Sequence, residues 1–178
     1  MLKLLIILMI VAGIPARAAE PRSAAPVSAR AQQRLQREVR SRLLRLPYYG
    51  VFDYLAFKVN GYNVTLEGSV TKPTLRRDAE AALKGIEGVE RLTNRIEVLP
   101  LSPHDDRLRM GLYRAIYGHI VLNRYALHPN PPIRIIVKNG NVTLEGVVLN
   151  DGDRNIAFLQ ANGVAGVFSV RNHLRTEK

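Results

Sequence analysis

Apolar side chains between residues 29 and 99 change their spacing along the chain, and each spacing indicates one kind of element. The first stripe consists of Leu35, Val39, Leu43 and Leu46. Spacings of four, four and three positions put these side chains on one side of a helix. We expect this helix to begin near Ala29 and to end before Pro47, because proline lacks the backbone donor that a helix needs.

Alternation follows the first helix and predicts a pair of strands. Apolar positions alternate over residues 55–59 and again over 64–70, and Asn60-Gly61 between them tolerates the positive φ angles of a tight hairpin turn. Thr71 is the expected cap of a second helix, whose apolar positions run from Leu75 to Ile86. A last strand is predicted over residues 92–98.

The same pattern of helices and strands occurs twice along the chain. The hexapeptide that begins at Asn63 occurs again, letter for letter, at Asn141, 78 positions later. The same offset predicts a helix at about 105–125, strands at 133–138 and 141–148, a helix at about 151–162 and a strand at 168–175. The fold class is therefore α+β: two tandem α-β-β-α-β domains, each a three-stranded sheet covered on one face by two helices.

The two copies differ in their first helix. The offset replaces Leu35 by Tyr113 and Val39 by Tyr117, and polar positions beside that stripe become apolar in the second copy, as at Ile116. An apolar surface wider than one sheet face needs indicates a second packing partner. Either this helix packs against the other domain, or it contacts lipid or a partner protein.

The ends of the chain predict export and set the domain boundaries. Residues 1–18 have a positive start, an apolar run too short to span a membrane and small residues before a cleavage site after Ala18, as in a signal peptide. Retention of the segment as an anchor is the alternative.

We expect a flexible leader at 19–28, a first domain at 29–99, a linker at 100–103 and a second domain at 104–178. The expected location is the periplasm, soluble or peripheral to a membrane.

The repeated motif resembles the BON domain, found in bacterial envelope proteins and osmotically induced periplasmic proteins. The matching residues are Val64–Val70 with Gly88, Val89, Leu92, Asn94 and Ile96, and Val142–Val148 with Gly166, Val167, Val170, Asn172 and Leu174. The resemblance implies a non-enzymatic, phospholipid-binding or membrane-attaching module with a role in envelope integrity or osmotic stress. A periplasmic chaperone or structural adaptor that binds envelope proteins is the alternative.

Glycine and asparagine positions of the motif carry structural expectations. Gly68 and Gly146 lie within strands, where glycine marks a bulge or a close backbone approach. Gly88 lies where a helix turns into a strand and a positive φ is favourable for glycine alone. Asn94 and Asn172 are expected to bond the backbone of a neighbouring turn.

Charge favours acidic partners, and the residue types argue against catalysis. The formal net charge is +11, and it falls to +9 without residues 1–18, which carry Lys3 and Arg17. Anionic phospholipid or a membrane surface is the expected partner, with envelope proteins as a further possibility and no nucleic acid, because the chain is predicted to be exported.

There is no cysteine, phosphate loop or paired histidine, and His104 with its two following aspartates fits the polar start of a helix. We expect no enzyme, no metal and no cofactor.

Arginines and tyrosines on the two first helices are the candidate binding residues. Guanidinium groups pair well with phosphate oxygens, and tyrosine suits either a headgroup interface or a seam between domains. The candidates are Arg30, Arg34, Arg37, Arg45, Arg109, Tyr113, Arg114, Tyr117 and Arg124.

Overall fold

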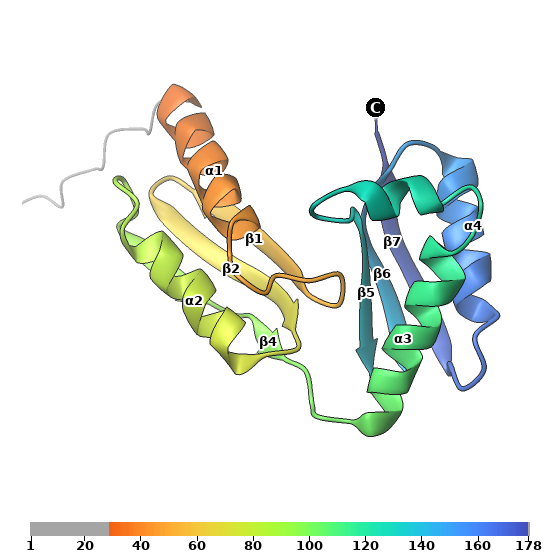
Figure 1. Cartoon of the computed structure of the whole chain (residues 1–178). Helices are drawn as coiled ribbons and strands as arrows, with labels where there is room; N and C mark the ends of the chain where they lie inside the picture. Colours follow the sequence, from red (N-terminus) through yellow and green to blue (C-terminus); the bar gives the residue numbers. More distant parts are fainter. Residues whose placement is uncertain (1–28, 178) are drawn as a thin grey trace, which may run out of the picture.

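Two α-β units follow one another in the computed structural model, which describes residues 29–177 (Figure 1). The expected signal peptide and leader lie outside the described residues. The first unit consists of α1 (Ala29–Leu44), β1 (Tyr54–Asn60), β2 (Asn63–Val70), α2 (Pro73–Lys84), β3 (Arg91–Asn94) and β4 (Glu97–Val98). The second consists of α3 (Pro103–Tyr117), the 3-10 helix η1 (Asn123–Leu127), β5 (Ile133–Lys138), β6 (Asn141–Val148), α4 (Asp151–Asn162) and β7 (Ser169–Thr176).

Both sheets have the same topology around a central strand. In the first sheet β2 pairs antiparallel with β1 and parallel with β3 and β4. In the second, β6 pairs antiparallel with β5 and parallel with β7. The predicted α+β fold class with two tandem units is confirmed, and two helices cover one face of each sheet (Figure 1).

Each unit has its own apolar core beneath its helices. Leu35, Val39 and Leu43 of α1 are buried against strand β2 and helix α2, as the stripe predicts. In the second unit Leu112 and Ile116 of α3 are completely buried among the side chains of β5, β6 and α4. The spacing of apolar positions therefore gives the inward face of these helices correctly.

Several local expectations need correction. The central residues of the first hairpin are Gly61 and Tyr62, one position later than expected, and only Gly61 of these two has a positive φ, of 61°. Thr71 does not cap α2; its amide and hydroxyl both donate to Asp53 Oδ1, at 2.7 and 2.9 Å. The last strand of the first unit is divided into β3 and β4 at Arg95 and Ile96.

Helix α3 is also shorter than expected. It ends at Tyr117, and Gly118 takes the C-cap position with its amide donating to Arg114 O. Glycine is a weak helix former and favours helix ends. The chain then turns, so that Leu122 and Tyr125 enter the core from η1 and the turn before it rather than from a longer helix.

The two units are joined by the segment that follows α1. Val51 O accepts a hydrogen bond of 2.9 Å from Ile135 N on the outer edge of β5, and Val51 and Phe52 pack against the core of the second unit. On the faces without helices, Lys138 Nζ lies 2.5 Å from Glu97 Oε1. The helix-free faces of the two sheets are therefore turned toward one another.

Candidate functional site

Three arginines of α1 form an exposed basic surface, here called the arginine face. Arg30, Arg34 and Arg37 are separated by four and three positions, so they lie on one side of the helix. All three are exposed, whereas the stripe of α1 that begins at Leu35 is buried. The amphipathic arrangement expected for a helix that rests on a charged surface is thus present.

Few acids neutralise the arginine face. Glu38, the nearby acid on α1, is bonded to Arg42 at 2.9 Å. Arg34 lies 3.8 Å from Glu87, and both side chains remain highly exposed, so this pair contributes little. Arg30 and Arg37 have no ion pair within residues 29–177. Their charge is available to an external anion.

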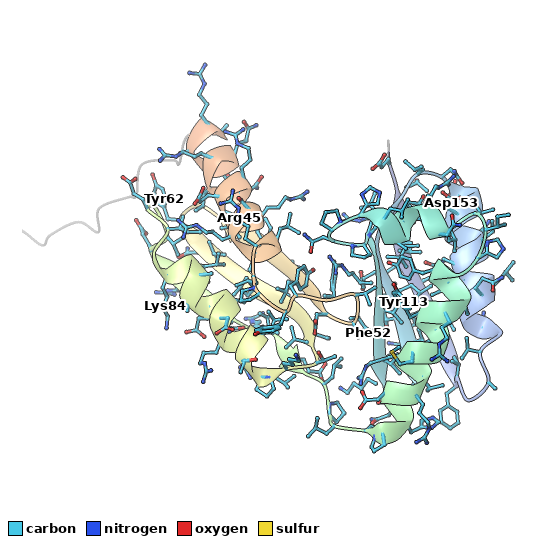
Figure 2. The ribbon with its side chains drawn as sticks, viewed as in Figure 1. Arg45, Phe52, Tyr62, Lys84, Tyr113 and Asp153 are labelled. Atoms are coloured by element: carbon cyan, nitrogen blue, oxygen red, sulfur yellow. The ribbon has the colours of Figure 1, made fainter. Side chains whose placement is uncertain are left out.

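Arg45 does not belong to the same helical face. It lies in the turn after α1, where its amide donates to Arg42 O at 3.3 Å, and its side chain is exposed (Figure 2). It extends the basic character of this end of the unit without sharing the spacing of the other three.

Two candidates on α3 are buried. Tyr117 is 4% exposed and its hydroxyl donates to Ile133 O at 2.5 Å. Burial raises its pKa well above the ordinary tyrosine value, with the nearby Arg134 and the bond to Ile133 opposing that shift. Arg109 is 5% exposed and donates to Asp106 Oδ1 and to Val137 O. Neither side chain is on a surface that a membrane could touch, so we leave both out of the proposed site.

Tyr113 lies at the seam between the units. Its ring meets the edge of Phe52 with centres 6.3 Å apart and packs beside Tyr117 at 5.0 Å (Figure 2). Of the two interpretations of the broad helix, packing against the other domain therefore accounts for this tyrosine. The wide apolar surface of this helix did indicate a second packing partner, but helical spacing alone does not identify that partner as the other domain.

The remaining candidates of the second unit are dispersed. The Arg124 guanidinium is bonded to the buried carboxylate of Asp153 and lies 5.2 Å from the ring of Tyr125. Arg114 is exposed and has no ion pair in the part of the chain that the structure describes. The structure thus brings together the three arginines of α1 and does not gather the second set into one surface.

A further group of cations, at the junction of the units, is absent from the candidates drawn from the sequence. Arg134 of β5 is 6% exposed, donates to Gly50 O at 2.8 Å and lies 4.4 Å above the ring of Tyr49. Its one signal in the sequence is a charge within the otherwise apolar run of β5. Arg175 gives no such signal, because it occupies an ordinary outward position in a strand.

Residues 29–177 contain no group of three acids or histidines placed to hold a metal ion. Within the same range, none of the helices combines the length and apolar character required to cross a bilayer.

Comparison with known proteins gives one family. The family described as BON domain matches residues 31–100 and 114–178, which is more than half of the chain. A search of curated proteins gives no match. Two solved structures of CdsD, a structural protein of the type III secretion system of Chlamydia trachomatis, are each 14% identical to this chain. One alignment covers 82% of this chain and 94% of that chain with a TM-score of 0.29; the other, with the C-terminal domain, covers 81% and 98% with a TM-score of 0.28.

Proposed function

Because the chain belongs to the BON domain family, which is linked to membrane and envelope binding, we propose that it binds anionic phospholipid surfaces through the arginine face of α1. The BON domain is a non-catalytic, binding-type domain, and the proposed role is that of a binding module. The observation that carries the proposal is the exposed, largely unpaired arginine face opposite a buried apolar stripe.

Electrostatics favours this interaction. A cationic side chain near an anionic membrane surface contributes about 1 kcal/mol, and the effect fades within a Debye length. Guanidinium groups also donate paired hydrogen bonds to phosphate oxygens. Three arginines on one helix face therefore support reversible, salt-sensitive attachment. We further propose that this attachment takes place in the periplasm, since residues 1–18 have the pattern of a signal peptide.

Sedimentation with vesicles tests the proposal. The purified protein is mixed with vesicles of phosphatidylcholine alone or with added phosphatidylglycerol, at low and at high salt. We expect it to sediment with the anionic vesicles at low salt and to remain in solution with neutral vesicles. Replacing Arg30 and Arg37 by glutamate should abolish sedimentation, because the helix face would then carry negative charge toward an anionic surface. The fold should be kept, since neither arginine has an ion-pair partner to lose within residues 29–177.

A matched control comes from the other helix of the same unit. Arg76 and Arg77 of α2 are exposed, and the double variant Arg76→Glu/Arg77→Glu changes the net charge by the same amount. It should sediment nearly as well as the wild type. An equal loss of sedimentation in both double variants would show that vesicle binding depends on overall charge alone, and it would contradict a specific role for α1.

Exposed apolar side chains favour a second candidate function, that of an adaptor for envelope proteins. Ile120 and Leu127, in the segment that follows α3, are 83% and 87% exposed. Large exposed apolar side chains are typical of protein contacts when they gather in one patch. Failure to sediment with any vesicle, together with co-purification of envelope proteins that is lost in Leu127→Asp, would favour this function instead.

A further inference from the structure

A crevice opens where the first unit meets the helix-free face of the second sheet. It has a volume of about 370 Å³ and is bordered by α1 and β1 on one side and by β5, β6 and β7 on the other. Pockets that hold small ligands in proteins have volumes of about 300–1,000 Å³. The crevice is therefore large enough for one small molecule.

Three arginines and no carboxylate line this crevice. They are Arg40 of α1, Arg134 of β5 and Arg175 of β7. Arg134 is only 6% exposed. Within residues 29–177 its guanidinium group donates to one carbonyl, Gly50 O, and lies over the ring of Tyr49. Arg40 and Arg175 also lack an ion pair in that range. Because none of the three guanidinium groups is held in an ion pair there, an anion in the crevice would be stabilised by them.

One acid lies beside these arginines without lining the crevice. Glu145 lies on the same sheet face and is 2.7 Å from His173 Nδ1. Tyr54, on the opposite wall of the crevice, has its pKa raised by burial first and by the negative charge of Glu145 second. Glu145 is the cross-strand neighbour of Arg134, so three guanidinium groups lie beside one carboxylate and the crevice keeps a net positive charge.

Apolar side chains supply the rest of the lining. Leu44 of α1, which is 45% exposed, Phe57 of β1 and Val147 of β6 border the same space. An apolar wall beside a group of guanidinium groups matches a molecule with an anionic head and an apolar chain. A simple inorganic anion would leave the apolar wall exposed to water, and a neutral chain would leave the arginines without a partner.

We propose that this crevice binds one single-chain amphiphile with a phosphate or carboxylate head group, with the head at Arg134, Arg40 and Arg175 and the chain along Leu44, Phe57 and Val147. The occupant contacts both units, so binding holds them in the observed arrangement. The arginine face of α1 adjoins this site at Arg37, which borders a neighbouring hollow with Arg40 and Phe57, but the crevice takes individual molecules rather than a membrane surface.

Calorimetric titration of the full chain tests the proposal. The probes are decyl phosphate and decanoate below their micelle concentrations, with decanol and inorganic phosphate as the uncharged and the chain-free comparison. We expect saturable binding of the two amphiphilic anions at one molecule per chain, and much weaker binding of decanol and phosphate. Binding should also raise the melting temperature of the protein, since the ligand binds only the folded state.

Variants locate the site without disturbing the junction. Arg134 also bonds Gly50 O, so the test uses Arg40→Gln/Arg175→Gln, which removes two exposed side chains without ion-pair partners in the described chain. Loss of two charged contacts should weaken decyl phosphate binding about tenfold or more. Arg76→Gln/Arg77→Gln, on α2, is the matched control and should bind as the wild type does.

The outcomes separate this site from the surface proposal. The variant Arg30→Glu/Arg34→Glu, whose residues do not border the crevice or the hollow beside it, should lose vesicle binding and keep the binding of decyl phosphate. Equal affinity for decanol and decyl phosphate would show that the arginines do not select the ligand, and equal affinity for inorganic phosphate would show a plain phosphate site. Either result, or the absence of saturable one-to-one binding, overturns the proposal.

Discussion

At the scale of single residues, two glycines of the repeated hexapeptides are required by close backbone contacts. Gly68 has a φ of 126°, and a Cβ built there would lie 2.0 Å from Tyr54 O. Gly146 has a φ of 127°, and its Cβ would lie 1.8 Å from Pro132 O. The sequence predicts a bulge or close approach at both positions, and the structure confirms it. At both positions the neighbouring backbone passes too near for any side chain.

We therefore expect Gly68→Ala to be strongly destabilising. The added methyl group meets a carbonyl oxygen and the backbone conformation is unfavourable for alanine, so unfolding free energy should fall by at least about 2 kcal/mol. Urea denaturation followed by circular dichroism measures the change. Gly85→Ala is the control, because a Cβ there has no atom within 4 Å; its effect should stay within about 0.5 kcal/mol. Similar losses in both variants would contradict this explanation.

At the scale of elements, a buried carboxylate fixes the start of α3 on the hairpin of its own unit. Asp105, in the first turn of α3, is completely buried and accepts hydrogen bonds of 2.8 Å from Asn139 N and 2.9 Å from Gly140 N. Its own amide donates to Ser102 Oγ at 3.2 Å. The sequence predicts acids at this helix start because of the helix dipole, whereas the bonds to the hairpin depend on the tertiary structure.

Replacing Asp105 by asparagine should test this anchor. The amide can accept through one oxygen only and presents its own donors to the hairpin, so we expect the unfolding free energy to fall by about 2 kcal/mol. Thermal and urea unfolding measure the loss. Asp151→Asn provides the comparison, since that exposed aspartate in the first turn of α4 bonds only Arg154 at its surface and should cost less than about 1 kcal/mol. If Asp105→Asn were no more harmful than Asp151→Asn, the anchor would have no energetic importance.

At the scale of the whole molecule, the units are held together by backbone, rings and charges from different parts of the chain. The segment after α1 extends the edge of β5 through Val51 O, and Phe52 meets Tyr113. At the other end of the facing sheets, Lys138 of the second unit pairs with Glu97 of the first. These contacts hold together the two units whose surfaces border the crevice, so a ligand that binds there depends on the arrangement of the two units.

A double-mutant cycle can test this arrangement in solution. Lys138→Ala and Glu97→Ala should each reduce the unfolding free energy slightly, and the double variant should show a coupling of about 0.2–1 kcal/mol, as is usual for exposed pairs. High salt should remove that coupling. The pair Lys58–Glu67, at 2.8 Å within the first unit, is the reference that does not depend on the arrangement of the units. Coupling at Lys58–Glu67 with none at Lys138–Glu97 would mean that the units are not placed as described.

The sequence by itself determined the fold class, the two units and the inward faces of their helices. These features depend on periodic burial and on short-range backbone rules, which adjacent residues express directly. The buried stripe of α1, the close backbone approach at Gly68 and the positive φ of Gly88 were accordingly predicted correctly. The arginine face of α1 follows from the same argument, because exposed positions are the complement of a buried stripe.

Only the tertiary structure decided which polar and aromatic residues of the second unit are accessible. Tyr117 and Arg109 were candidates for a binding surface, yet both are buried and bonded to backbone carbonyls of β5. The positions of Arg134 and Arg175 beside Arg40 likewise depend on how two separately folded units meet. Helical spacing fixes the direction of a side chain about the helix axis. That residues 40, 134 and 175 line one crevice is set by packing between parts far apart in the chain, which local patterns do not encode.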